Sequence, residues 1–324
     1  MEYRRLGTTG VNVSRLGLGC GNFGGIGSAP QFFGQGENEA QAFALMDRAF
    51  EAGINFFDTA DAYGGGRSET YIGRWLEAKG AAARQRLLLS SKVFNRVGPG
   101  PNDRGLSRQH ILRQVDESLK RLKTDWLDLY LIHEPDPETP LEETLSALDD
   151  LVRAGKVLYV GASNIEAWRL ARSLWISEVR RLVRFEWVQN AYSLLDRTPE
   201  RELFPLCADR GVGFTAFSPL SGGWLTGKYR ASATFPEGSR MTLRPEPYRH
   251  LVSDAVYRGL DALAGEARAR GVEMSAIAIA WVLHHPRSDA AIIGPRTPAQ
   301  LDAALTATSL TLSDEDARRL ADLF

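Results

Sequence analysis

The sequence predicts an α/β fold, a (β/α)8 TIM barrel that forms a single domain over residues 1–324. Short apolar runs alternate with amphipathic segments, a pattern typical of a parallel sheet covered by helices. The runs recur roughly every 30 residues, and this even spacing favours a closed barrel over an open doubly wound sheet. No linker rich in Pro, Gly or Ser divides the chain, and barrels of this size occur as one domain.

Eight apolar runs are candidates for the barrel strands. Each is short and nearly continuous, as expected of strands that are buried on both faces. The predicted strands are Arg15–Gly19, Ile54–Asp58, Leu87–Val93, Leu127–Ile132, Val157–Gly161, Phe185–Gln189, Val212–Phe217 and Ala290–Ile293.

Segments with helical periodicity lie between these runs. Leucines recur at helical spacing in Leu141–Ala154, and Gly155 follows as a helix stop. The same spacing predicts a helix over His110–Leu122, with Ser107 as a candidate N-cap.

Two long loops follow the first and the seventh predicted strand, at Gly21–Gly36 and Ser218–His250. Loops beyond ~12–15 residues are usually functional, and barrel enzymes place their sites at this end of the strands. Aromatic residues in the loops either line an apolar pocket or pin the loops down: Phe23, Phe32, Phe33 and Trp224. The remaining residues fit a short N-terminal segment, for which a β-hairpin is one form, and a C-terminal helix.

The composition excludes several classes of protein. The 39 Lys and Arg nearly balance the 40 Asp and Glu, and no block of like charge occurs, which argues against nucleic acid and anionic membranes as partners. No apolar stretch reaches the ~18 residues of a membrane span, and the N-terminus lacks the apolar run of a signal peptide. Two cysteines, Cys20 and Cys207, fit a reducing cytoplasm and exclude a Cys-rich zinc site.

Three motifs mislead. Gly19–Gly24 matches G-x-G-x-x-G, but more glycines follow instead of the helix that a Rossmann fingerprint needs. Gly222–Lys228 resembles a P-loop but lacks the hydroxyl residue that would hold Mg²⁺. The adjacent His284 and His285 would point in different directions on a helix, so we predict packing or surface histidines and no metal site.

Polar residues stand at the ends of the predicted strands, and a barrel brings these ends to one face. Asp58 closes the second strand, Lys92 lies near the end of the third, and His133 follows the fourth. A lysine inside the run LLLSSKVF needs a partner if it is buried, and Asp58 is the obvious candidate. Later strand ends carry Ser163, Asn164, Gln189 and Ser218.

Together with Tyr63, the first three residues suit proton transfer to a carbonyl oxygen while another group delivers a hydride. A tyrosine with a pKa near 10 is a poor proton donor at neutral pH, and a nearby buried ammonium is expected to lower that pKa. A shift of three units corresponds to ~4 kcal/mol, about what one unit charge supplies at ~4 Å. His133 could orient the carbonyl oxygen or assist the proton transfer.

Motifs spread over nearly the whole chain carry a family resemblance. They are Tyr3–Gly7 (YRRLG), Asp58–Gly64 (DTADAYG), Lys92, Asp125–His133 (DWLDLYLIH), Gly155–Val157, Gly161–Asn164 (GASN), Gln189, Phe217–Leu220 (FSPL), Gly227–Tyr229 (GKY), Gly294–Thr297 (GPRT) and Gln300–Leu301. On these motifs the chain resembles the aldo-keto reductase superfamily, in particular bacterial reductases allied to potassium-channel β-subunits.

The resemblance implies a barrel that binds NADPH without a Rossmann motif, with Tyr63 as proton donor and Asp58, Lys92 and His133 completing a catalytic tetrad. The residues implied to bind the cofactor are Cys20, Ser163, Asn164, Gln189, Phe217, Ser218, Pro219, Leu220, Gly222, Lys228, Arg240, Gly294, Arg296 and Gln300.

The resemblance also implies a role for each group of cofactor residues. Those for the nicotinamide carboxamide are Ser163, Asn164 and Gln189, and Phe217 would stack on the ring. Those for the pyrophosphate are Ser218, Leu220, Gly222 and Lys228. Those for the adenosine phosphate are Gly294, Arg296 and Gln300, with Arg240 as a further candidate. A cation at a helix start suits an anion, which favours NADP over NAD.

The chain departs from relatives at three places. Ala303 and Ala304 replace a Glu-Asn pair that often contacts adenine, so adenine recognition is expected to be weaker or moved. Cys20 and Gly21 replace a Thr-Trp pair beside the nicotinamide, which predicts a roomier pocket. Phe217 has no hydroxyl.

The leading hypothesis is a cytoplasmic NADPH-dependent reductase of a small-molecule aldehyde or ketone. Two alternatives stay open, a cofactor-binding regulatory subunit with little turnover and a sugar or polyol dehydrogenase that works in the oxidative direction. Substrate choice should depend on the loops Gly21–Gly36, Asn95–Arg104 and Gly222–His250.

Overall fold

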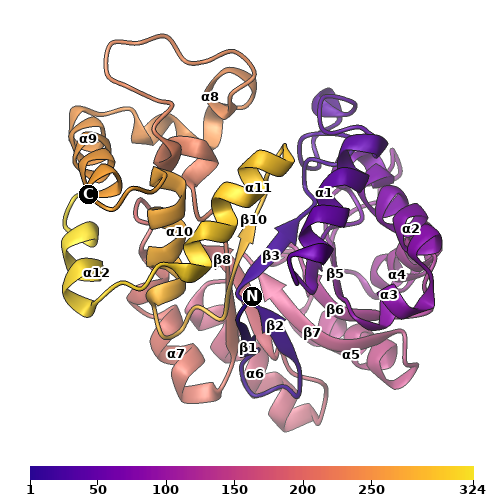
Figure 1. Cartoon of the computed structure of the whole chain (residues 1–324). Helices are drawn as coiled ribbons and strands as arrows, with labels where there is room; N and C mark the ends of the chain where they lie inside the picture. The colour runs from indigo at the N-terminus through magenta and orange to yellow at the C-terminus, as the bar shows by residue number, and fades with distance from the viewer.

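Eight parallel strands close into a barrel in the computed structural model, which describes residues 1–324 (Figure 1). The strands follow one another around the ring in chain order, and β10 closes it against β3 and β9. They are β3 (Leu16–Gly19), β4 (Phe56–Asp58), β5 (Leu88–Val93), β6 (Leu127–Ile132), β7 (Val157–Ser163), β8 (Trp187–Ala191), β9 (Gly213–Phe217) and β10 (Ala290–Ile293). The predicted barrel is therefore confirmed, and no strand end differs from the predicted one by more than two residues.

Helices surround the barrel and cover its outer face (Figure 1). They are α1 (Glu39–Glu51), α2 (Arg67–Lys79), α3 (Ala81–Gln85), α4 (Arg108–Leu122), α5 (Leu141–Arg153), α6 (Ala167–Arg180), α7 (Leu203–Arg210), α8 (Arg240–Leu243), α9 (Asp254–Ala269), α10 (Met274–His284), α11 (Pro298–Leu305) and α12 (Asp314–Ala321). The Ser107 side chain caps α4 by accepting from the His110 backbone N–H, as predicted. Buried side chains of the helices and the strands together form an apolar cluster of 68 residues.

An antiparallel hairpin of β1 (Tyr3–Arg5) and β2 (Asn12–Ser14) lies across one end of the barrel, so the N-terminal segment has the hairpin form (Figure 1). Its Leu6 and Val13 belong to a second buried cluster, whose other members include Phe56, Leu129 and Trp187 of the barrel strands. Since burying a large apolar side chain contributes about 1.5–3 kcal/mol, this cluster fixes the hairpin to the barrel.

The two long loops contain structure of their own. The segment after β3 carries the short 3-10 helix η1 (Pro30–Phe32), and the segment after β9 carries η4 (Ser221–Thr226), α8 and η5 (Glu246–Leu251). Phe23 and Trp224 are 1% and 0% exposed, so these two aromatics pin the loops down and do not line an open pocket. Phe32 and Phe33 are half-buried.

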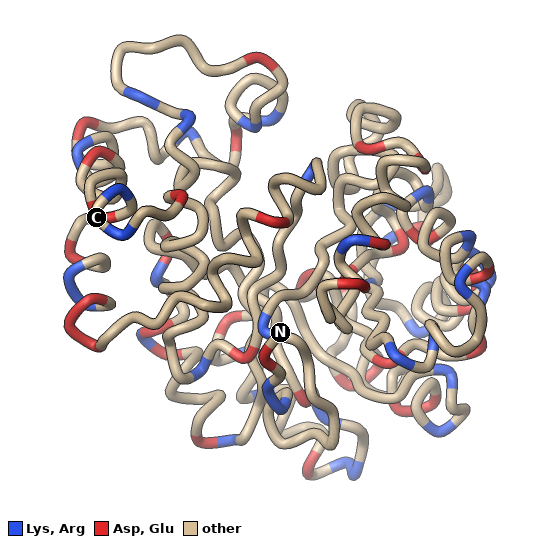
Figure 2. Tube along the Cα trace, in the orientation of Figure 1, with Lys and Arg blue, Asp and Glu red and all other residues tan.

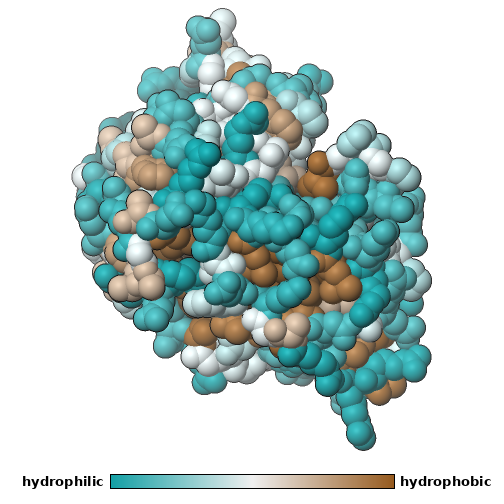
Figure 3. All heavy atoms as spheres, turned by 90° about the vertical axis from the view of Figure 1, so that its right-hand side faces the viewer, coloured by the Kyte–Doolittle hydropathy of each residue, from teal (hydrophilic) through white to brown (hydrophobic).

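Figure 2 shows basic and acidic residues intermixed along the surrounding helices. On the side formed by α1 to α4, apolar residues make small areas interrupted by polar ones (Figure 3). None of the helices combines the length and the apolar character that crossing a membrane requires.

Candidate active site

A buried ion pair lies at the carboxyl ends of β4 and β5. The register pairs Asp58 with Ser90, which brings the Lys92 side chain beside Asp58. Lys92 Nζ donates to Asp58 Oδ2 at 2.5 Å and to the Thr59 carbonyl oxygen at 2.9 Å. The Lys92 and Asp58 side chains are only 1% and 5% exposed. A buried ammonium needs such partners, so the predicted pairing is confirmed.

The second carboxylate oxygen of Asp58 is also occupied. Asp58 Oδ1 accepts from Ser90 Oγ and from Gln189 Nε2, each at 3.0 Å. Side chains from two strands, β5 and β8, therefore hold this carboxylate in one position. Gln189, predicted to bind the nicotinamide carboxamide, also supports the ion pair through its amide N–H.

Tyr63 and His133 lie beside this pair and are half-buried. The Tyr63 hydroxyl is 3.3 Å from His133 Nε2, and Lys92 Nζ is 5.2 Å from the centre of the Tyr63 ring. Tyr63 begins η2 (Tyr63–Gly66), where Gly64 has a φ of 59° and a Cβ would lie 2.6 Å from the Phe23 carbonyl oxygen. Glycine therefore permits the tight turn that presents Tyr63 to the site.

The electrostatics of the tetrad differ from the prediction for one residue. Burial raises the pKa of Tyr63, and the opposing effect of Lys92 does not overcome it, so the expected net lowering of this pKa is wrong. Burial, helped by Lys92, lowers the pKa of His133 well below its usual value. Burial alone would lower the pKa of Lys92, but Asp58 and Tyr63 outweigh it and the pKa is raised. The site therefore holds a protonated tyrosine, a neutral imidazole and a charged lysine.

The predicted nicotinamide residues form a continuous group next to His133. The register pairs Ser163 with Gln189, and Asn164 follows with a φ of 54°. Asn164 Nδ2 donates to the His133 carbonyl oxygen at 2.9 Å and to Ser163 Oγ at 3.2 Å. Phe217 ends β9 and packs against the cluster inside the barrel. Hydroxyl and amide groups thus lie next to one side of the tetrad.

The segment after β9 has a backbone shape suited to an anion. Ser218, Ser221, Gly222 and Gly223 all have positive φ. Successive backbone N–H groups in such a turn can face one concavity, and concavities of this kind bind phosphates in proteins. Lys228 lies against this segment, because a Cβ at Gly223 would be 2.5 Å from Lys228 Nζ. Pro219 is buried and Leu220 half-buried at the start of the segment.

Three cations gather here with a single carboxylate. Arg296 Nε donates to Glu37 Oε1 at 2.8 Å, and Arg240 donates to Asn22 Oδ1 at 2.6 Å. Lys228 has no carboxylate partner, and burial together with the two arginines lowers its pKa. The other Glu37 oxygen is buried without a hydrogen-bond partner. This excess of positive charge, which we call the cation cluster (Lys228, Arg240 and Arg296), fits a phosphate group.

The remaining predicted cofactor residues are Gly294 and Gln300, which follow β10, and Cys20, which lies in the core. Gly294 is exposed beyond the end of β10, and the Gln300 side chain accepts from the Arg296 backbone N–H at 2.8 Å. Cys20 is 0% exposed and its thiol donates to the Leu18 carbonyl oxygen at 3.5 Å. Burial raises the pKa of Cys20 well above its usual value, so its side chain behaves as a core residue.

Asn95 and Glu37 are among the residues that contact the predicted site and that the sequence analysis did not name as site residues. Asn95 Nδ2 is 2.9 Å from His133 Nδ1, and Glu37 pairs with Arg296. Asn95 follows β5 closely, so the strand-end rule that selected Lys92 could have included it. Glu37 lies at the end of the first long loop, and nothing in its local sequence pattern marks it.

The misleading motifs have ordinary structural roles. The glycine-rich segment Gly19–Gly24 leads into a loop, and the next α-helix starts only at Glu39. His284 pairs with Asp314 at 3.0 Å, and His285 stacks on Phe204 with ring centres 4.4 Å apart. The prediction of packing and surface histidines is confirmed. No group of three or more His, Cys, Asp or Glu side chains is arranged to hold a metal ion.

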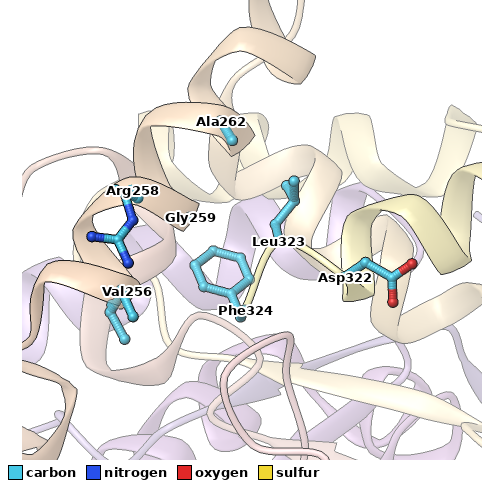
Figure 4. A pocket seen from close by; sticks show the side chains of 8 residues that line it. Val256, Arg258, Gly259, Ala262, Asp322, Leu323 and Phe324 are labelled. Carbon is cyan, nitrogen blue, oxygen red and sulfur yellow. The ribbon is translucent and has the colours of Figure 1, made fainter.

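A pocket of about 350 Å³ lies apart from the tetrad, between α9 and the C-terminal end of the chain (Figure 4). It is lined by residues of both segments, including Arg258, Asp322 and Phe324. Gly259 lets the chain end approach, because a Cβ there would lie 2.5 Å from the Phe324 ring. None of its lining residues belongs to the predicted site.

Comparisons with known proteins agree with these motifs. A model of the aldo/keto reductase family matches residues 15–323. The oxidoreductase YrpG of Bacillus subtilis, which is described as uncharacterised, is 40% identical, with 100% of this chain and 96% of YrpG covered. Versiconal hemiacetal acetate reductase of Aspergillus parasiticus is 34% identical, with 99% and 96% covered. A probable voltage-gated potassium channel subunit beta of Arabidopsis thaliana is 34% identical, with 96% and 92% covered.

Proposed function

The chain belongs to the aldo/keto reductase family, and we propose that it is an NADPH-dependent oxidoreductase that reduces an aldehyde or ketone to an alcohol. The observation that carries the proposal is the position of the Tyr63 hydroxyl. It is 3.3 Å from His133 and lies beside a buried Lys92–Asp58 pair. A half-buried acid next to a fixed positive charge suits protonation of a carbonyl oxygen.

The tetrad residues have distinct tasks in this reaction. As negative charge develops on the carbonyl oxygen, the Tyr63 O–H bond breaks and its proton forms the alcohol O–H bond. The Lys92 ammonium stabilises the phenolate that remains, and Asp58 keeps that ammonium charged and in place. The raised pKa of Tyr63 keeps its proton on until the carbonyl oxygen becomes basic enough to take it.

The cation cluster and the strand-end amides support NADPH as the cofactor, which supplies a hydride when bound. Ser163, Asn164 and Gln189 would hold its carboxamide, and Phe217 would stack on its ring. Arg296 and Arg240 would bind the adenosine phosphate, which NADH lacks, and Lys228 would bind the pyrophosphate.

The relatives leave two other functions to test. Similarity to a channel subunit suggests a regulatory protein that binds the cofactor with little turnover. The same tetrad run in reverse would make a sugar or polyol dehydrogenase, since proton transfer through Tyr63 is reversible. NADPH oxidation over a panel of aldehydes, ketones and sugars, with NADP⁺ reduction by the matching alcohols, distinguishes all three.

The decisive variant is Tyr63→Phe, which removes only the hydroxyl. We expect cofactor binding, followed by fluorescence, to stay unchanged while the reduction rate falls by about 10²-fold or more, as for loss of a general acid. Turnover close to that of the unsubstituted protein would refute Tyr63 as the proton donor.

A further inference from the structure

We propose that Asn95 is a positioning residue that holds His133 in the tautomer with its proton on Nε2. Asn95 lies two residues beyond β5, and His133 directly follows β6. The two strands pair Val93 with Ile132, and the His133 backbone N–H donates to the Val93 carbonyl oxygen at 2.9 Å. Strand register therefore fixes the approach of these two side chains.

In the hydrogen bond between Asn95 and His133, only Asn95 can be the donor. Asn95 Nδ2 is 2.9 Å from His133 Nδ1, and an amide nitrogen can only donate. His133 Nδ1 must then carry a lone pair, so a neutral ring has its proton on Nε2. The ring is neutral because burial and the neighbouring Lys92 lower its pKa well below the usual value.

This tautomer decides what the Tyr63 proton can do. With a proton on Nε2, His133 donates to the Tyr63 oxygen, 3.3 Å away, and the Tyr63 proton is free to point at a substrate. In the other tautomer Nε2 would be an acceptor. The Tyr63 hydroxyl would then donate its hydrogen bond to His133 and not to a substrate. Asn95 thus makes His133 a donor toward the place where a carbonyl oxygen would lie.

The tautomer can be measured without any turnover, by the nitrogen-15 chemical shifts of histidine in the whole protein. We expect His133 Nε2 to show the shift of a protonated ring nitrogen and Nδ1 that of an unprotonated one at neutral pH. The reverse assignment, which an amide turned by half a rotation would produce, overturns the proposal. The consequence for rate rests on the proposed reduction, whereas the tautomer does not, so failure of one is distinguishable from failure of the other.

Asn95→Asp reverses the hydrogen bond with almost no change of shape. A carboxylate accepts from Nδ1–H, so the neutral ring is expected to carry its proton on Nδ1 and the rate to fall by about 10²-fold. The titratable groups facing His133 are Lys92 of β5 and Tyr63 of η2, and Asp58 pairs with Lys92. The added carboxylate opposes Lys92 and raises the pKa of His133, and the imidazolium that forms at lower pH again donates through Nε2.

The pH profile therefore separates a positioning role from a purely structural one. The reduction rate of Asn95→Asp should rise as the pH falls. The pH profile of the unsubstituted protein should show no such rise. Asn95→Leu keeps the volume, leaves a mixture of tautomers and should lose about five-fold, the factor that one neutral hydrogen bond supplies. Asn12→Asp adds the same charge at an exposed position of the N-terminal hairpin, away from the tetrad, and should change neither the shifts nor the profile. Equal losses in Asn95→Asp and Asn95→Leu, with no rise in rate as the pH falls, would overturn the proposal.

Discussion

The tetrad and the cation cluster are built from different parts of the barrel. Asp58 takes its partners from β5 and β8, and the tetrad's ion pair is almost completely buried. The cation cluster comes from the segment after β9 and from the loop after β10, and Arg296 pairs with Glu37 at the end of the loop after β3. Its Arg296 side chain is 44% exposed. Strands thus hold the buried ion pair, whereas the segments between strands and helices carry the cation cluster.

The largest expected effect comes from Asp58→Asn, which leaves the Lys92 ammonium buried beside a neutral amide. Removing one partner of a buried ion pair costs ~3–5 kcal/mol, and we expect that loss in the free energy of unfolding measured with denaturant. Asp58 is the main group that raises the pKa of Lys92, so without it burial lowers this pKa. The unfolded state then binds more protons, and the variant should gain stability as the pH rises toward the usual lysine range.

Asp302→Asn is the matched control for this variant. Asp302 pairs with Arg48 at 2.7 Å on the surface, where both side chains are about half exposed. Exposed pairs contribute only ~0–1 kcal/mol, so the stability should scarcely change. Equal losses in the two variants would mean that burial does not distinguish the tetrad pair.

The contrast between strands and loops also explains which site residues could be predicted from the sequence. The strands are continuous apolar runs, and a closed parallel barrel brings their ends together, so Asp58, Lys92 and His133 followed from position alone. Glu37 did not, because a loop's path depends on packing such as that of Phe23, which has no periodic signal. The direction of the Tyr63 pKa was missed because a sequence gives the charge of Lys92 but not the degree of burial.

A smaller effect is expected for Arg296→Ala in the cation cluster. Loss of one charge-assisted hydrogen bond, ~1.5–3 kcal/mol, should weaken NADPH binding by about 10- to 100-fold. NADH, which lacks the adenosine phosphate, should bind nearly as before. Fluorescence titration with both cofactors measures this, with Arg319→Ala on α12 as a control that removes an exposed arginine paired with Glu266 and Asp316. An equal loss of affinity for both cofactors would mean that Arg296 binds a part of the cofactor that NADPH and NADH share.

The smallest effect has the opposite sign. The Glu37 carboxylate occupies Arg296, so a phosphate must displace it, and Glu37→Gln should tighten NADPH binding by about two- to ten-fold, the range of ~0.5–1.5 kcal/mol for one exchanged hydrogen bond. Burial raises the pKa of Glu37 despite Arg296, so this carboxyl takes up a proton at a higher pH than an ordinary glutamate. As the pH falls, the unsubstituted protein should therefore approach the affinity of the variant. Glu39→Gln, which affects only an exposed pair with Arg74, should leave the affinity unchanged. Weaker NADPH binding in Glu37→Gln would show that Glu37 holds Arg296 in place for the phosphate and does not compete with it.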